Sequence, residues 1–210
     1  QMLFRPLYLT GWMICDSLMA GDPQPDVAVI SSASSKTAIA AAHSLQRRGV
    51  RTVGVTSPRN VQFVKDTGLY DEVLEYDAIG NFSTTGKSAY VDFVGRPEFT
   101  KAVHTACGDS MIRSLVIGAT DWEDKRVPVT DLPGPEPEFF FVPDYAANRA
   151  KELPAGELDK RTGADLVAFY PVSKAFVTPT QVSGATAIAK AWRDTVEATV
   201  PADKGLVCTF

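Results

Sequence analysis

The chain has 210 residues, 45% of them hydrophobic, and a formal net charge of −4. This length and hydrophobic content are sufficient for one globular domain with a sizeable core. The acidic balance and the lack of a long basic run argue against a nucleic-acid partner. Arg5, Gly11 and Asp16 interrupt the apolar stretch 3–20, so we expect neither a membrane span nor a signal peptide there.

The cysteines and histidines indicate no metal or disulfide chemistry. Cys15, Cys107 and Cys208 are odd in number and far apart, which is typical of free thiols in a reducing compartment, so we expect a cytoplasmic protein. Both histidines, His43 and His104, fall within helical patterns without ligand-like neighbours. No metal site is therefore predicted.

Short apolar or β-branched runs alternate with helical patterns along the first half of the chain. The predicted strands are 27–31, 51–56, 72–76, 89–94 and 112–118, and helical patterns at 38–48 and 61–67 lie between some of them. Continuous apolar strands joined by helical crossovers predict an α/β fold, a Rossmann-like doubly wound parallel sheet in three α/β/α layers. We treat residues 1–210 as one such domain, with residues 1–25 supplying a helix that leads into it.

The C-terminal part follows a loop at 125–137 that is rich in Pro, Gly and Asp. We expect residues 138–210 to supply closing strands and helices: a strand at Phe139–Val142, a helix at Ala185–Thr199 and a final strand at Gly205–Phe210. Successive side chains of a strand alternate faces, so at least one of the three phenylalanines at 139–141 must point away from the main packing layer.

The first strand leads into a turn of small hydroxyl residues and then into an Ala-rich helix, VAVISSASSKTAIAAA at 27–42. A strand that delivers its chain into a helix N-terminus is typical of a phosphate-binding turn, so we take Ser32, Ser34, Ser35 and Lys36 as cofactor-binding candidates. Small side chains permit close approach where φ stays negative, and Ser34 and Ser35 are suited to cap the helix. Lys36 opposes the helix dipole unless it meets an anion; a solvated surface lysine is the alternative.

The second strand ends in TSPRN at 56–60, where dinucleotide sites often carry an acid for the adenosine ribose. No acid is present here. Ser57 and Arg59 leave room and charge for a 2′-phosphate, which favours NADP(H) over NAD(H), and Asn60 is placed to cap the next helix. The alternative is that these residues only form a turn and that Arg59 is a solvated charge.

Ligands of open parallel sheets bind outside the carboxyl ends of the strands. The loops after the fourth and fifth predicted strands should therefore face the nucleotide. Their candidate residues are Val94, Gly95, Gly118, Ala119 and Thr120.

Taken together, VAVISSASSKTA, VGVTSPRNVQFVKDTGLYDEVLEYD, YVDFVG and SLVIGATDW, in this order, resemble the cofactor-binding half of medium-chain dehydrogenases, in particular the zinc-free quinone reductases. The specific variant resembles the DUF2855 family. The GAAGGVG turn of the reductases maps onto residues 32–38, where Ser32, Ser35 and Ala38 replace its glycines. The resemblance covers about 4–118, and more weakly the end, where GLVCTF is similar to the strand that closes the reductase fold.

The resemblance implies an NADP(H) cofactor and hydride transfer to a carbonyl or enone of a small-molecule substrate. It places Asp121 and Trp122 near the nicotinamide, although Trp122 is equally suited to be a core anchor. No catalytic residue stands out, since nothing distinguishes Tyr8, Tyr145 or Tyr170.

Reductases of this kind carry a GroES-like catalytic domain before the cofactor half, and we expect it to be absent here, in a truncated or a naturally solitary domain. The missing glycines motivate a second hypothesis, a non-redox module that serves in a lyase or isomerase or as an interaction domain. These reductases commonly dimerise through the edge of the cofactor domain, so we also predict a homodimer with Phe139–Val142 at its centre.

Overall fold

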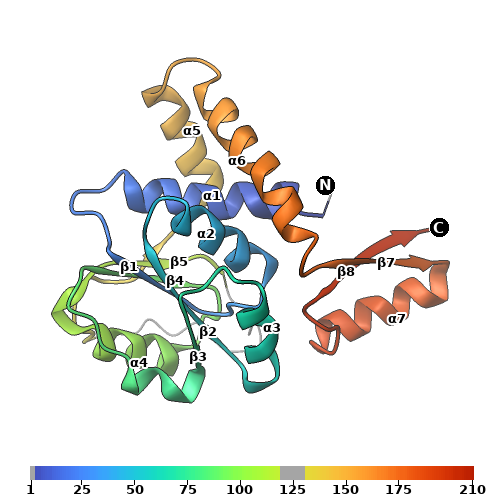
Figure 1. The fold of residues 1–210 in the computed structure, drawn as a ribbon, viewed down its shortest axis with the longest axis horizontal. Coiled ribbons are helices and arrows are strands. Elements are labelled where there is room, and N and C mark those ends of the chain that lie inside the picture. Colours follow the sequence, from blue (N-terminus) through green and yellow to red (C-terminus); the bar gives the residue numbers. More distant parts are fainter. Residues whose placement is uncertain (1–2, 119–130) are drawn as a thin grey trace.

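A computed structural model describes residues 3–118 and 131–210 (Figure 1). Its main sheet has the strand order β3-β2-β1-β4-β5-β6, and every neighbouring pair is parallel. The strands are β1 Val27–Ile30, β2 Arg51–Thr56, β3 Glu72–Glu75, β4 Ser88–Asp92, β5 Met111–Val116 and β6 Glu138–Phe139. The predicted doubly wound Rossmann-like fold is thus confirmed, and the strand order reverses between β1 and β4, where such sheets bind ligands.

Helices α1 Arg5–Met19 and α2 Lys36–Gln46 lie on one face of this sheet, and α4 Pro97–Cys107 lies on the other. The other helices are α3 Val61–Asp66, α5 Val142–Glu152, α6 Glu157–Ser173 and α7 Ala185–Val196. Short 3-10 turns occupy Pro58–Asn60, Tyr76–Asn81 and Gly108–Ser110. No described helix is long and apolar enough to cross a membrane. Among the described residues, no group of three or more His, Cys, Asp and Glu side chains is placed to hold a metal ion.

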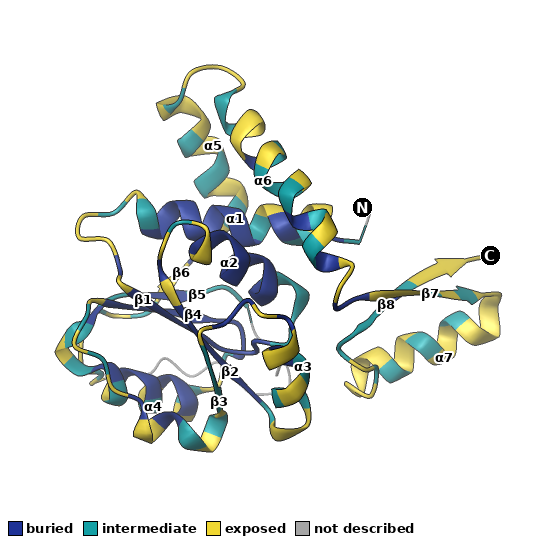
Figure 2. Ribbon diagram, in the orientation of Figure 1, coloured by how far each residue is buried: buried dark blue, intermediate teal, exposed yellow. Residues whose placement is uncertain are grey.

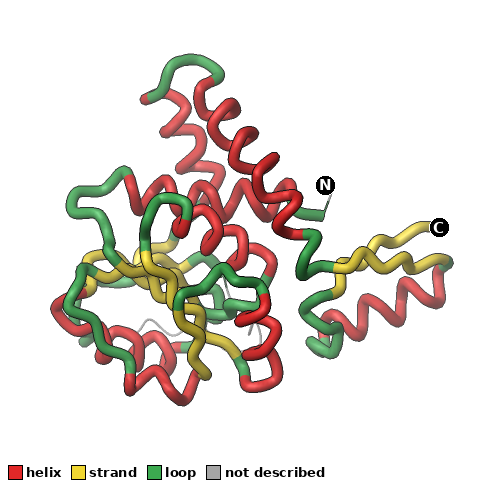
Figure 3. The backbone as a smooth tube through the Cα atoms, viewed as in Figure 1, coloured by secondary structure: helices red, strands yellow, loops and turns green. Residues whose placement is uncertain are grey.

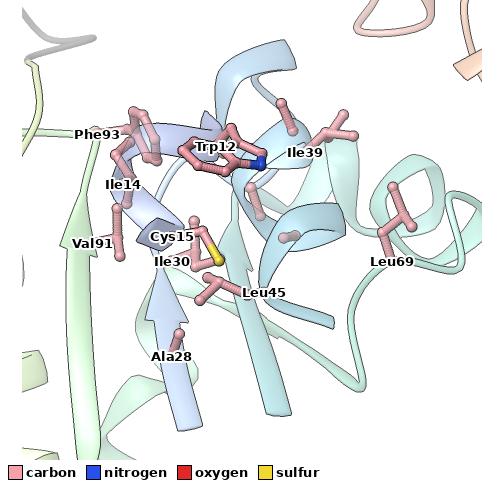
Figure 4. Packing of buried hydrophobic residues seen from close by; sticks show 14 of the residues in the cluster. Trp12, Ile14, Cys15, Ala28, Ile30, Ile39, Leu45, Leu69, Val91 and Phe93 are labelled. Atoms are coloured by element: carbon pink, nitrogen blue, oxygen red, sulfur yellow. The ribbon is translucent and has the colours of Figure 1, made fainter. Parts of the chain in front are cut away.

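The period of a strand divides the core into two clusters. Ala28 and Ile30 of β1 face the side of α1 and α2, while Val27 and Val29 face the side of α4. On the first side, Trp12 of α1 lies among buried aliphatic residues of α2 and the sheet, as Figure 4 shows. Figure 2 shows the same burial along α1 and α2.

Gly11 permits α1 and α2 to approach this closely. A Cβ at this position would lie 2.5 Å from the backbone nitrogen of Ala41 and 2.8 Å from the carbonyl carbon of Ala40. Any larger residue at Gly11 would therefore push the two helices apart.

Two carboxylates fasten the α5–α6 hairpin to the rest of the molecule. Asp16 of α1 accepts hydrogen bonds from the Tyr145 hydroxyl at 2.7 Å and from the Arg149 guanidinium at 2.8 Å. Asp165 of α6 accepts one from Trp12 Nε1 at 2.7 Å and one from Arg47 at 3.2 Å. The hairpin is consequently attached to α1 and α2 at two separate points.

The predicted strand at Phe139–Val142 needs correction. Only Glu138 and Phe139 form β6, and α5 already begins at Val142. Pro143 explains this early start, because proline suits the first turn of a helix, where its missing N–H costs nothing. Phe140 is buried (6% exposed), whereas Phe139 (60%) and Phe141 (51%) are exposed at the edge of the sheet.

The C-terminal residues form a separate unit of structure, β7 Thr178–Ser183, α7, and β8 Lys204–Thr209. The strand expected at 205–210 is present as β8, but it pairs with β7 in a parallel two-stranded sheet and not with the main sheet. Figure 3 shows this pair extending away from the other strands, with α7 along one side.

Candidate functional site

In the turn between β1 and α2, a serine and not a glycine adopts the left-handed backbone conformation. Ser32 has φ +48°, so the condition of a negative φ, under which small side chains permit close approach, is not met at this residue. The physical reason is that the chain must still reverse tightly where the reductase turn has glycine, and serine tolerates this conformation at some cost. The Ser32 N–H donates to the Tyr76 hydroxyl at 3.2 Å.

The beginning of α2 offers hydrogen-bond donors. Ser35 is the N-cap, as predicted, and its hydroxyl accepts from the Ala38 N–H at 3.3 Å. The N–H groups of Lys36 and Thr37 have no acceptor within residues 3–118 and 131–210. First-turn amides of this kind, together with the positive end of the helix dipole, are suited to an anion. This donor set fits a phosphate group despite the missing glycines.

Lys36 is half-buried, not a freely solvated surface lysine. Its Nζ donates to the carbonyl of Ala202 at 3.3 Å, and no carboxylate of the described chain lies within ion-pair distance of it. Loss of hydration on burial lowers the pKa of Lys36, and the nearby Asp203 carboxylate opposes this shift.

The second turn is joined to the first through side chains. The Asn60 amide donates to the hydroxyls of Ser34 at 3.1 Å and Ser57 at 3.2 Å. The prediction that Asn60 caps α3 is therefore wrong: it occupies the N-cap position, but its side chain is directed to the serines. Arg59 is exposed and forms no ion pair with any described residue.

Five of the predicted cofactor-binding residues line one cavity of about 930 Å³. They are Ser34, Ser35, Lys36, Arg59 and Asn60. Apolar side chains of Leu3, Phe63 and Leu206 also line it. This volume and this mixture of apolar wall and convergent polar groups are typical of a site for part of a nucleotide.

The loop after β4 is built on a buried carboxylate. Asp92 Oδ1 accepts from the N–H groups of Val94 at 2.9 Å and Gly95 at 3.0 Å and from the Ser31 hydroxyl at 2.9 Å, while Oδ2 accepts from Thr100. The Ser31 hydroxyl in turn accepts from the Val94 N–H at 3.0 Å. This network holds the loops after β1 and β4 together at the point where the strand order reverses.

The remaining predicted residues divide into three groups. Val94, Gly95 and Gly118 lie at the strand ends beside Asp92 and do not line the 930 Å³ cavity. Ser32 lies in the turn after β1 and Ser57 in the turn after β2, but neither lines the cavity. Ala119 and Thr120, together with Asp121 and Trp122, lie outside the described residues.

The sequence reasoning missed Tyr76, which follows β3 and contacts the turn between β1 and α2 through Ser32. Its ring packs edge-on against Phe99, with centroids 4.8 Å apart, and the Arg96 guanidinium lies over it at 5.4 Å. Because Tyr76 directly follows β3, the rule that strand ends face the ligand was the signal that could have found it. Asp92, the last residue of β4, escaped notice in the same way.

Comparisons with known proteins show the family and the fold of the chain. A family model described as "Protein of unknown function (DUF2855)" matches residues 1–201. The chain belongs to the DUF2855 family. A comparison with curated proteins gives no match.

Solved structures share the fold of this DUF2855 chain. CurA from Vibrio vulnificus, in complex with NADPH, has a TM-score of 0.64 and 18% identity, covering 96% of this chain and 61% of its own. YhdH from E. coli K-12, with bound NADPH, has a TM-score of 0.63 and 16% identity, and the match covers 95% of this chain and 61% of YhdH. A mutant enoyl thioester reductase from Candida tropicalis has a TM-score of 0.63 and 14% identity, and the match covers 97% of this chain and 59% of the reductase. The chain thus spans about three fifths of the length of these structures, and the relation of this DUF2855 chain to the reductases is shown in its fold.

Proposed function

We propose that this chain binds NADP(H) as the cofactor-binding part of a reductase that transfers hydride to a carbonyl or enone of a small molecule. The observation that carries the proposal is the 930 Å³ cavity, which brings Lys36 and Arg59 together with the start of α2. Two similar structures were determined with NADPH, which supports the same cofactor here.

Each part of the site has a distinct role in this proposal. The free amides of Lys36 and Thr37 hold the pyrophosphate at the start of α2, and the Lys36 ammonium adds a positive charge. Arg59, which lacks an ion pair within the described chain, binds the 2′-phosphate beside Ser57. Val94, Gly95 and Gly118 line the path toward the nicotinamide at the strand ends. When bound, the cofactor supplies the hydride, and the protein orients it.

One observation favours the second hypothesis, a module without redox function. The Ser32 N–H lies in the phosphate-binding turn but is already used by the Tyr76 hydroxyl. If Tyr76 keeps this contact, one backbone donor of the turn is lost to the pyrophosphate. The absence of any binding of NADPH or NADH to this chain would support the module without redox function.

Titration calorimetry with NADPH and NADH tests the proposal directly. We expect tighter binding of NADPH, and we expect Arg59→Ala to weaken NADPH alone by about 1.5–3 kcal/mol, the range of hydrogen bonds to charged groups. Arg51→Ala is the matched control, because Arg51 lies at the start of β2, at the other end of the strand from the turn that carries Arg59, and pairs with Glu72. Equal affinities for the two nucleotides, or no binding at millimolar concentration, contradict the proposal.

The assembly and location belong to the same proposal. We propose a homodimer formed through β6, because exposed Phe139 lies on this edge strand and exposed Phe141 follows it closely. A two-fold interface would cover both copies of this edge together. We also place the protein in the cytoplasm, which the free thiols of Cys15, Cys107 and Cys208 support.

A further inference from the structure

The cavity has a second wall that sequence reasoning did not assign. Opposite the two βα turns, it is lined by the end of α7 and the segment leading into β8, that is, by Thr195, residues 198–204 and Leu206. This wall is more than 130 residues away in sequence from the turns that it faces. The carbonyl of Ala202, which accepts from Lys36 Nζ, joins the two walls directly.

Charged groups from both walls meet in this cavity. Lys36 and Arg59 lie on the first wall and Lys204 on the second, while Asp66 and Asp203 also line it. Lys204 pairs with Asp203 at 2.8 Å, and both side chains are more than a third exposed. Asp203 also acts on Lys36, since its charge opposes the lowering of the Lys36 pKa. Lys204 is thus a cation on the cavity wall whose charge is shared with one exposed carboxylate.

The arrangement of polar and apolar groups fits one end of a nucleotide. Phe63, Leu206 and Leu3 offer an apolar surface to an adenine ring, and Arg59 lies on the first wall, in the turn that follows β2. A 2′-phosphate carries up to two negative charges, so it is best held by cations from more than one direction. Arg59 alone, on the first wall, provides only one such direction.

We infer that the segment 198–206 is the second wall of the adenosine 2′-phosphate subsite and that Lys204 is a specificity-determining residue within it. This inference rests on the proposed NADP(H) function. Lys204 faces the phosphate from the side opposite to Arg59, and Asp203 limits the affinity because its carboxylate repels the phosphate. The C-terminal strand pair is therefore part of the nucleotide site.

The inference predicts opposite effects for two neighbouring residues. With adenosine 2′,5′-bisphosphate as the probe, Lys204→Gln should weaken binding about fivefold to tenfold, and Asp203→Asn should strengthen it about twofold to fivefold, in calorimetry at low salt. Adenosine 5′-monophosphate should bind all three proteins equally. Lys190→Gln is the matched control, because Lys190 pairs with Asp194 on α7 and does not line this cavity. Circular dichroism confirms that each variant is folded.

The outcomes separate this inference from the proposed function. If the bisphosphate binds more tightly than the monophosphate and Lys204→Gln changes neither affinity, the second wall plays no part in recognition, and only the inference is overturned. A loss for both nucleotides in Lys204→Gln also overturns it, because Lys204 would then act on the shape of the cavity and not on the 2′-phosphate. If the unaltered protein binds neither nucleotide, the proposed function itself fails.

Discussion

The Asn60 side-chain amide donates to the hydroxyls of both Ser34 and Ser57, so a single residue joins the turns after β1 and β2. Asn60→Ala removes both bonds, and we expect it to lower the free energy of unfolding by about 1 kcal/mol. The substitution should weaken the binding of NADPH and of NADH to the same extent, because it loosens the turns without removing a charge. Urea unfolding and calorimetry measure the two effects. A loss confined to NADPH would instead mean that Asn60 contacts the 2′-phosphate.

Asp92→Ala should destabilise the fold strongly. The substitution removes the acceptor for two backbone N–H groups and for the hydroxyls of Ser31 and Thr100, all in a buried setting. We expect a loss of about 3 kcal/mol or more in the free energy of unfolding, since buried donors are left unpaired. Asp109→Ala, at an exposed position of the Gly108–Ser110 turn, should stay within about 0.5 kcal/mol of the unaltered protein. Similar urea midpoints for the two variants would contradict the role given to Asp92.

The left-handed conformation of Ser32 gives a contrast between two substitutions. Ser32→Val places a β-branched side chain at φ +48° and should cost about 2 kcal/mol of unfolding free energy. Ser32→Gly relieves the backbone and should remain within about 1 kcal/mol of the unaltered protein, although it loses the hydroxyl. Thermal and urea unfolding of both variants check the contrast. Equal losses would show that the hydroxyl, and not the backbone, determines the effect.

His43 should make the protein less stable in mild acid. Burial, and secondarily the Arg47 charge, lowers the His43 pKa from 6.5 to about 4, and His43 Nδ1 lies within hydrogen-bond distance, 3.0 Å, of the Tyr8 hydroxyl. The unfolded chain takes up this proton near pH 6.5 and the folded chain only near pH 4. Stability is therefore complete above pH 6.5 and falls as the pH is lowered from 6.5 to 4, by about 2 kcal/mol at pH 5. Urea unfolding at pH 7 and pH 5 should show a smaller fall for His43→Gln; an equal fall would assign the dependence to other groups.

The proposed dimer can be tested at its edge strand. Phe139→Asp and Phe141→Asp each place a charge on the exposed edge, and we expect either one to weaken self-association by at least about tenfold. Val167→Asp is the control, because Val167 is an exposed apolar residue of α6, away from β6. Sedimentation velocity at tens of micromolar measures the dimer. A monomer before any substitution would contradict the proposal.

The accuracy of the sequence predictions follows the range of the interactions involved. The five strands β1 to β5 and the Ser35 cap depend on local pattern and on neighbours a few residues away, and they were predicted within one or two residues. The pairing of β7 with β8 was not predicted, because strand pairing across more than twenty residues leaves no local signal. The second wall escaped for the same reason, whereas Tyr76 directly follows β3 and could have been found from its place at a strand end. Only the folded chain brings Lys36 to Ala202.

The attachment of α6 has a consequence for the 930 Å³ cavity, although α6 does not line it. β7 follows α6 after the short connection 174–177, in which Phe176 and Val177 are buried in the core. The position of the C-terminal strand pair thus depends in part on the contacts of Asp165 in α6 with Trp12 and Arg47. Besides the Lys36–Ala202 hydrogen bond, residues on the far side of α2 that do not line the cavity thus contribute to its width between Arg59 and Lys204. Substitutions there can change the affinity of the proposed nucleotide site although the lining residues stay the same.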